Sequence, residues 1–316
     1  MVDPIDRVTQ VAMRARPSRG EVFPDGFGDE AILDEMFEAF GPDTPMRPVE
    51  VIWGTPVVEP LITRTPGEFD SPWEDYLSGP ALDGEVELIE PHGGSDRLVL
   101  LLPAWGDESY EPRRRLGRLL AQRGISSLLL MNPLFGPRRI HGGHLPIRTV
   151  SDFCLQALIT VREARALLDS MRADWDIGVS GFSMGSGYTV ATSLTLPFPA
   201  AIALAPAAHS PAWTFTRGIM GTRLAPEFDE RAKTRLFEIL DAPGACHQEP
   251  LPHHATSVLV AAKGDGFVVP HEAHRLHAHW EGSELREISG GHARTWLLKK
   301  PEMADAIEKS FVRTYA

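Results

Sequence analysis

The sequence predicts an α/β protein whose mostly parallel sheet carries helices on both faces. Short apolar runs alternate with helical patterns through most of the chain, as in strand–helix–strand crossovers. Residues 97–103 and 125–131 are apolar along almost their whole length, which is typical of strands buried on both faces. The chain of 316 residues is long enough for one large domain with appendages, which we prefer to several domains.

Composition restricts the partners and the location that we expect. Hydrophobic residues make up 43% and charged residues 23%, as in ordinary globular proteins. A net charge of -12 argues against nucleic acid and against attraction to anionic membranes. With two cysteines, no signal peptide and no apolar run of about 18 residues, we expect a cytoplasmic protein with no integral membrane segment. Whether it forms a homo-oligomer stays open.

The N-terminal quarter reads as an appendage packed on the core. Residues 1–45 are polar with helical spacing, and Gly41-Pro42 ends that pattern. Residues 45–80 are rich in proline and aromatic residues, so we expect an extended segment rather than a flexible linker. The predicted domains are therefore an appendage at residues 1–80 and the main domain at 81–316.

The main domain alternates strands and helices up to its end. Residues 85–90 alternate in polarity as a half-exposed edge strand would. Ser151 is expected to cap the helix at 152–172. Residues 207–256 break the rhythm with short helical pieces, many prolines and histidines, and we interpret them as a small cap or lid. The remaining predicted strands are 97–103, 125–131, 176–180, 200–205, 257–262 and 285–289, and the remaining helices are 113–123, 184–193, 270–280 and 302–315.

A nucleophile elbow is predicted at Gly181-Phe182-Ser183-Met184-Gly185. A G-x-S-x-G pentapeptide alone is weak evidence, but this one lies between a strand pattern and a helix pattern. Such a strand-to-helix turn is so sharp that only glycine fits on either side of the serine. Because a serine hydroxyl needs an adjacent base, a histidine and an acid are expected after later strands.

The best-placed partners of Ser183 are Asp265 and His292. Asp265 directly follows the strand at 257–262, and His292 follows the last strand behind two glycines. Carboxyl ends of parallel strands form the functional edge of an open sheet. The alternative acid is Asp241, because the turn chemistry of Gly264-Asp265-Gly266 has an explanation of its own. The oxyanion of an acyl intermediate is expected to bind the backbone N–H groups of Met184 and Trp105, with Gly106 next to the latter.

The order Ser, Asp, His around a strand-elbow-helix unit predicts the α/β-hydrolase fold. Four blocks further resemble the α/β-hydrolase-domain-containing family numbered eighteen, over roughly residues 65–316. Here the first block has Leu134-Phe135 where the family has Phe-Tyr, and Ser186 stands where a third glycine is usual. The resemblance implies a serine hydrolase acting on esters, with lipid acyl groups included. The blocks are MNPLFGPRR at 131–139, VSDF at 150–153, GFSMG at 181–185 and GGH at 290–292.

Two further groups of residues are candidates for substrate binding. Arg138 and Arg139, with His141 and His144, follow a strand and suit an anionic group, although salt bridges to the carboxylates of this acidic protein are the more ordinary explanation. Three aromatic residues near the site are expected either to line an acyl pocket or to belong to the core. They are Trp105, Phe182 and Trp296.

No metal or cofactor is expected. The histidines at 271, 274, 277 and 279 would spread around a helix, no cysteine completes a zinc set, and hydrolysis by serine needs no metal. The basic run at 113–115 is interpreted as a solvated helix start.

The function predicted is hydrolysis of carboxylic esters through Ser183, His292 and Asp265. The alternatives are acyl transfer or peptide hydrolysis by the same residues, or a non-catalytic binding protein on this fold.

Overall fold

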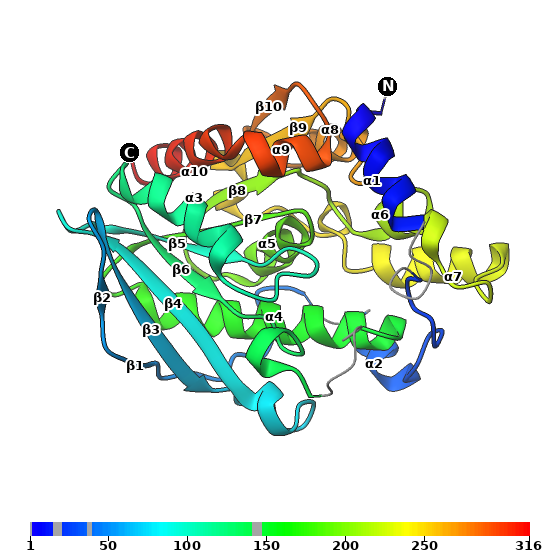
Figure 1. The fold of residues 1–316 in the computed structure, drawn as a ribbon, viewed down its shortest axis with the longest axis horizontal. Helices are drawn as coiled ribbons and strands as arrows, with labels where there is room; N and C mark the ends of the chain where they lie inside the picture. Colours follow the sequence, from blue (N-terminus) through cyan, green and yellow to red (C-terminus); the bar gives the residue numbers. More distant parts are fainter. Residues whose placement is uncertain (1, 15–20, 37–39, 141–146) are drawn as a thin grey trace.

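The computed structural model describes residues 2–14, 21–36, 40–140 and 147–316, with only the backbone at 12–14. These residues form a three-layer α/β structure around one ten-stranded sheet (Figure 1). The strand order is β1-β3-β4-β6-β5-β7-β8-β9-β10, and β2 pairs with β3 at the edge. The predicted fold class, a mostly parallel sheet with helices on both faces, is confirmed.

The parallel part of the sheet runs from β6 to β10 and has a fully buried centre. Its strands are β5 (Arg97–Leu102), β6 (Ser126–Leu130), β7 (Asp176–Phe182), β8 (Ala201–Ala205), β9 (Val258–Ala262) and β10 (Glu284–Ile288). Every residue of β6, β8 and β9 is buried, which explains the continuous apolar sequences of β8 and β9 and the three leucines that end β6. All six strands occur close to the predicted positions.

The antiparallel part departs from the prediction. β4 (Asp83–Pro91) is an interior strand, because β3 (Ile62–Asp70) pairs with it along its whole length. The sheet therefore extends across the boundary predicted at residue 80. β1 (Ile52–Trp53) and β2 (Val57–Val58) cover the outer side of β3. Pro66 and Gly67 within β3 lower strand propensity and concealed this strand in the sequence.

One face of the sheet carries α3 (Glu111–Ala121) and α10 (Lys300–Tyr315). Their apolar side chains, among them Leu116, Leu120 and Phe311, form one hydrophobic core with the side chains of that face. Gly178 in β7 makes room for this packing, since a Cβ there would lie 2.6 Å from the ring of Phe311. Both helices were predicted.

The opposite face carries α4 (Val150–Met171), α5 (Met184–Thr195) and α8 (Pro270–His279). Thr149, rather than the predicted Ser151, caps α4: its side chain accepts from the Asp152 N–H, while Asp152 accepts from the Thr149 N–H. Ser151 lies inside the first turn and accepts a hydrogen bond from Asp29 N–H instead. None of the described helices is long and apolar enough to cross a membrane.

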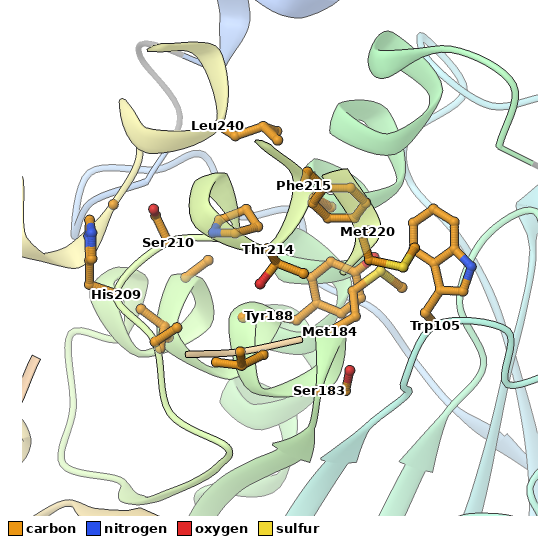
Figure 2. A pocket seen from close by; sticks show the side chains of 18 of the residues that line it. Trp105, Ser183, Met184, Tyr188, His209, Ser210, Thr214, Phe215, Met220 and Leu240 are labelled. Atoms are coloured by element: carbon orange, nitrogen blue, oxygen red, sulfur yellow. The ribbon is translucent and has the colours of Figure 1, made fainter. Parts of the chain in front are cut away.

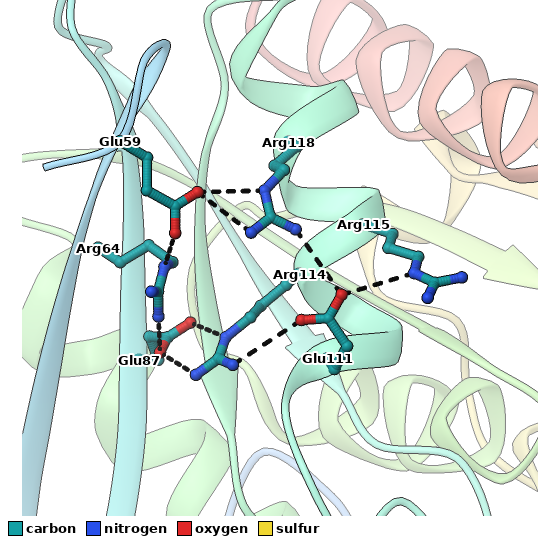
Figure 3. Close-up of polar contacts among 7 residues, drawn as sticks. All are labelled: Glu59, Arg64, Glu87, Glu111, Arg114, Arg115 and Arg118. Atoms are coloured by element: carbon teal, nitrogen blue, oxygen red, sulfur yellow. Dashed lines mark hydrogen bonds and ion pairs between the residues drawn. The ribbon is translucent and has the colours of Figure 1, made fainter. Parts of the chain in front are cut away.

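An ion-pair network ties α3 to the antiparallel strands (Figure 3). Arg114 donates twice to Glu87 of β4, and Arg64 of β3 bonds to the same carboxylate at 3.0 Å. Glu59 joins Arg64 to Arg118. The basic run was predicted to be a solvated helix start, but only Arg115 is largely exposed. Arg113 is buried, where it donates to the carbonyls of Leu101 in β5 and Leu130 in β6.

The described part of the predicted N-terminal helical stretch holds two helices, and residues 15–20 and 37–39 of that stretch lie outside the described residues. α1 (Pro4–Arg14) lies beside α9 (His292–Leu298), at the carboxyl edge of the sheet (Figure 1). α2 (Glu30–Glu35) packs near α4. Between β8 and β9, the stretch predicted as a cap holds α6 (Ala212–Thr216) and α7 (Glu230–Asp241). Short 3-10 helices occupy Gly79–Leu82, Gly136–Arg138, Met220–Arg223, Ala245–His247 and Pro252–Thr256.

Candidate active site

Ser183 stands on a sharp turn between β7 and α5. Its backbone has φ 59° and ψ -118°, a conformation that is rare and strained for a residue with a Cβ. A Cβ on Gly181 would lie 2.3 Å from the carbonyl carbon of Gly185, and one on Gly185 would lie 2.4 Å from the Leu102 carbonyl oxygen. The two glycines are therefore required by close backbone contacts, as the motif predicts.

Ser183, His292 and Asp265 form one chain of hydrogen bonds. His292 Nε2 lies 2.9 Å from Ser183 Oγ, and His292 Nδ1 lies 2.9 Å from Asp265 Oδ2. The other oxygen of Asp265 accepts from the N–H groups of Phe267 and Val268, both at 2.8 Å. The Asp265 side chain is fully buried, so its negative charge is held against the imidazole. The geometry selects Asp265 over Asp241 as the partner of His292.

Asp6 holds the two loops that carry Asp265 and His292. Its buried carboxylate accepts from His292 N at 2.8 Å, from Ala293 N at 2.9 Å and from Gly266 N at 3.0 Å. It thus caps α9 and pins the Asp265 turn in one interaction. A Cβ on Gly291 would lie 2.4 Å from Asp6 Oδ2, so this glycine permits the approach. Sequence reasoning missed Asp6, because nothing local distinguishes it from a surface carboxylate.

The two predicted oxyanion donors come from two different segments of the chain. Met184 is the first residue of α5, where the N–H has no partner within the helix. Trp105 lies in the loop after β5, and Asp107 holds this loop by accepting from the Ala104 N–H at 3.3 Å. Arg113, 3.2 Å from Asp107, fixes that carboxylate from behind. The role of both N–H groups in catalysis remains a prediction.

A cavity of about 290 Å³ opens at Ser183 and His292. Figure 2 shows Trp105 on one side of it and His209 with Ser210 on the other. Thr9 of α1 and several residues of the predicted cap contribute to its walls. Most of its surface is apolar. The apolar lining includes Met36, Phe40, Trp105, Phe153, Met184, Tyr188, Phe215, Met220, Leu240 and Phe267.

Phe182 and Trp296 do not take the predicted place in an acyl pocket. The described residues that line the cavity do not include either side chain. Instead, the two rings stack with centroids 4.7 Å apart, and Phe182 lies 4.8 Å from the His292 ring. Phe182 belongs to the hydrophobic core, and Trp296 packs against that core. Because Phe182 also contacts the imidazole, the two rings support His292 from the core side.

Arg138 is not a substrate-binding residue. Its side chain is fully buried, forms a two-pronged ion pair with Glu163, and donates to the carbonyls of Ala81 and Met131. With all its nitrogens occupied, it has no donor left for a ligand. Arg139 pairs with Glu108, so the salt-bridge alternative describes both arginines. The other two candidates, His141 and His144, lie outside the described residues.

The histidines of α8 each have a separate partner. His271 pairs with Glu272, His274 with Glu287, His277 with the Ser283 hydroxyl, and His279 with the carbonyl of Gln248. They therefore form no shared ligand set among the described residues.

The two cysteines are free thiols, and burial raises the pKa of Cys154 to about 12, far from that of a reactive nucleophile.

A different cluster, His209, Asp241 and His247, has ligand atoms within 4.8 Å of one another. However, Arg275 Nη1 lies 2.7 Å from His209 Nε2, the atom that would face an ion. A guanidinium at that distance repels a cation, so we do not interpret the cluster as a metal site.

The comparisons with known proteins agree with this architecture. An acetyl xylan esterase from Paenibacillus sp. R4 has a TM-score of 0.55 at 14% identity, covering 88% of this chain and 93% of that one. A cold-adapted esterase from an Arctic intertidal metagenomic library has a TM-score of 0.54 at 17% identity, over 83% and 99%. Carboxyl esterase 2 of the fungus Tuber melanosporum has a TM-score of 0.53 at 13% identity, over the full length of both. At these identities the likeness establishes the fold.

No curated protein sequence matches the chain. A family model does, under the description "Alpha/beta hydrolase domain containing 18", over residues 21–246 and 229–313. These ranges cover most of the chain, including the elbow, the acid and the histidine. The chain therefore belongs to the alpha/beta hydrolase domain containing 18 family.

Proposed function

We propose that this protein is a serine hydrolase that cleaves carboxylic esters through an acyl-enzyme. The observation that carries the proposal is the unbroken chain of hydrogen bonds from Ser183 through His292 to buried Asp265, at the mouth of an apolar cavity. The family and the esterases that share the fold support the same class of reaction.

In the proposed reaction, His292 Nε2 takes the proton of Ser183 while Oγ attacks the ester carbonyl. The carbonyl oxygen becomes an oxyanion that accepts from the N–H groups of Met184 and Trp105. Asp265 stabilises the imidazolium that has formed and keeps the ring in the required tautomer. The intermediate then collapses, and His292 returns the proton to the leaving alcohol.

Deacylation repeats these steps with water. His292 takes a proton from a water molecule, whose oxygen attacks the acyl carbon of the Ser183 ester. The second intermediate breaks its bond to Oγ, which recovers the proton from His292, and the carboxylic acid leaves. An apolar cavity beside Ser183 suits the hydrocarbon part of an ester, and its volume of about 290 Å³ favours a small or medium-sized group.

A fluorophosphonate probe tests the nucleophile. Wild-type protein should be labelled at Ser183, and Ser183→Ala should not. Ser186→Ala is the matched control, because this serine lies one turn further along α5 and its buried hydroxyl has no hydrogen-bond partner within the described part of the chain. Labelling of Ser183→Ala, or none of the wild type at high probe concentration, would contradict the proposal.

4-Nitrophenyl esters of increasing acyl length then test the reaction class. We expect hydrolysis with an optimum length set by the cavity, and an initial burst of nitrophenol if deacylation is the slower step. A peptide substrate and an added alcohol acceptor serve as comparisons. Faster turnover of the peptide would identify a peptidase, and faster transfer to the alcohol an acyltransferase. Ligand binding without any turnover would identify a binding protein.

A further inference from the structure

The outer edge of the sheet carries an exposed apolar segment at residues 46–61. Twelve large hydrophobic side chains are exposed among the described residues, and six of them lie in this short segment. Residues 52–58 are exposed without a break, and the run 51–58 contains no charged residue. A contiguous apolar patch on a surface marks a site of interaction. The exposed hydrophobic side chains of the segment are Met46, Ile52, Trp53, Val57, Val58 and Leu61.

The backbone of this edge is poorly suited to the addition of a further strand. β1 and β2 lie one after the other along β3 (Figure 1), and no strand in the described part of the chain pairs with their outer side. Between Gly54 and Val57, the edge has one residue more than the facing part of β3, which makes a β-bulge. Pro56 within the bulge has no N–H to donate. A partner on this edge must therefore bind its side chains rather than continue the sheet.

The sequence of the segment is nearly symmetric about its centre. Three apolar residues, Val-Ile-Trp, precede Gly54-Thr55, and three others, Pro-Val-Val, follow it. When a protein pairs with a second copy across a twofold axis, the same patch is used twice in opposite directions. An axis at Gly54-Thr55 places Ile52 of one copy opposite Val57 of the other. Apolar side chains then face apolar side chains along the whole contact.

Charge favours a second copy of this chain as the occupant. The chain has 43 acidic and 31 basic residues, so two copies repel each other over most of their surface. The run 51–58 can meet its counterpart without removing water from a carboxylate. At each end, the same axis brings the exposed Glu50 toward residue 59 of the other copy, beside which Arg118 lies with 39% of its side chain exposed. An acid therefore faces a base at both ends of the contact.

The exposed area is sufficient for a weak but specific dimer. With ordinary side-chain areas, the six hydrophobic residues expose on the order of 600 Å² in one copy. Two copies would bury about 1,200 Å², which is the lower limit of specific interfaces between proteins. We infer that residues 46–61 form the interface of a twofold dimer of this chain, held by side chains, with a Kd in the micromolar range.

The two candidate active sites of such a dimer stay open and separate. β1 is separated from β7, which leads to Ser183, by the strands β3, β4, β6 and β5. The interface therefore leaves the cavity of each copy uncovered. The dimer does not depend on the proposed esterase function, so each can be tested without the other.

Sedimentation velocity at protein concentrations from about 1 to 100 µM tests the dimer. The wild type should shift with concentration from a species of 34.8 kDa to one of twice that mass. In the double variant Ile52→Lys, Val58→Lys, like charges meet across the axis, and we expect the Kd to rise about 100-fold or more. Both side chains are exposed, at 74% and 73%, so the midpoint of urea unfolding should remain that of the wild type.

The double variant Leu297→Lys, Leu298→Lys is the matched control. It adds the same two charges at apolar positions of α9 that are 66% and 64% exposed. We expect it to dimerise with the Kd of the wild type. Loss of the dimer in this control as well would contradict the assignment to residues 46–61, because added charge alone would then explain the effect.

A cross-link tests the position of the axis without relying on the lysine variants. In Thr55→Cys, the two new thiols lie near the twofold axis, so mild oxidation should give a covalent dimer at low protein concentration. Thr234→Cys, at an exposed position on α7, is the matched control and should cross-link no faster than the wild type with its own two cysteines. Equal cross-linking in both variants would place the contact elsewhere.

Three further results would overturn the inference. One is a monomer at every concentration of wild-type protein. Another is a dimer that persists unchanged in Ile52→Lys, Val58→Lys. The third is a mass that continues to rise beyond that of a dimer, since a closed twofold contact ends at two copies.

Discussion

The two halves of the candidate site are held together in different ways. The Ser183 turn depends on contacts within five residues and with the neighbouring strand, through Gly181 and Gly185. The loops of Asp265 and His292 depend on Asp6, which is 286 residues before His292. The nucleophile is therefore placed by local backbone geometry, and its base and acid are placed by tertiary structure. Each half should fail in its own way.

The largest loss of stability is expected from a change in the Ser183 turn, which local backbone contacts hold. Gly181→Ala would force a Cβ to within 2.3 Å of the backbone of Gly185, which cannot move without displacing Ser183. We expect destabilisation by more than about 4 kcal/mol, or no folded protein. Gly187→Ala is the control, because a Cβ there meets nothing within 4 Å and the residue lies in α5. Urea unfolding should show this control to be as stable as the wild type or up to about 1 kcal/mol more stable.

Asp265→Asn tests the hydrogen bond between Asp265 and His292, the acid and base that tertiary contacts place. The amide cannot stabilise a positive imidazole, and it favours the wrong tautomer of His292. We expect kcat for 4-nitrophenyl esters to fall by about 10³–10⁴, while the protein still folds. Asp241→Asn is the matched control and should retain most of the activity, since Asp241 bonds to Ser210 and His247 rather than to His292. Equal losses in both variants would contradict the assignment of the acid.

Asp6→Asn tests the carboxylate that holds the loops of Asp265 and His292 in place. The amide retains one oxygen acceptor and adds an NH₂ donor that faces backbone N–H groups. We expect kcat to fall about 10- to 100-fold with little change in KM, because misplacement of His292 weakens proton transfer rather than binding. Asp6→Glu should recover part of the rate.

Asp3→Asn provides the comparison at the residue just before α1, since Asp3 pairs with Arg294 but accepts no hydrogen bond from His292. Its kcat should remain within a few fold of the wild type. A change in KM alone in Asp6→Asn would mean that α1 only lines the cavity through Thr9.

His254, a buried histidine outside the site, is also held by contacts distant in sequence, so it extends the comparison to the stability of the fold. His254 Nδ1 accepts from Leu251 N at 2.9 Å, its Nε2 lies 3.0 Å from Ser193 Oγ, and its ring stacks on Trp280. Burial lowers the pKa of His254 to about 2. The unfolded chain thus binds more protons than the folded protein below about pH 6.5. The contribution of His254 to the free energy of unfolding is therefore fully present above about pH 6.5 and decreases as the pH falls below it.

The expected slope is up to about 1.4 kcal/mol per pH unit from His254 alone. His254→Asn keeps an acceptor near Leu251 but does not titrate, so its unfolding free energy should depend less steeply on pH between 6.5 and 4. Activity at pH 7 should stay near the wild-type value. His274→Asn, at an exposed position on α8, should follow the wild-type slope. Parallel slopes for all three proteins would contradict this account.

The elbow was predictable because its requirements are local. Gly181, Ser183 and Gly185 are adjacent in sequence, and the apolar strand before them is buried on both faces. Asp265 and His292 were predictable because parallel strands bring their carboxyl ends to one edge. Asp6 was not predictable, since a carboxylate near a chain's start is usually solvated and its partners are backbone groups, which no side-chain pattern reveals.

Burial and packing decided between the alternatives that the sequence left open for Arg138, Phe182 and Trp296, and they also explain the strand that it concealed. Arg138 looked like an anion-binding residue after a strand, but Glu163 reaches it from inside α4, a position that periodicity alone does not mark as charged and buried. Phe182 and Trp296 were placed near Ser183 correctly, yet on the core side of His292. β3 was hidden by Pro66 and Gly67, and only its pairing with β4 makes it a strand.

The contact between Asp6 and His292 has a consequence for biosynthesis. Because 286 residues separate them, α1 leaves the ribosome long before the N–H groups that its carboxylate binds. At about 5–20 residues per second, the interval is on the order of 15–60 s. Ser183 is made 109 residues before His292, so for the last part of that interval, about 5–20 s, it lies in a nascent chain that lacks its base and in which Asp6 has no N–H groups of His292 and Ala293 to bind. If the proposed function holds, we expect a partly translated chain to be inert and reactivity to appear only once the last strand and α9 have been made.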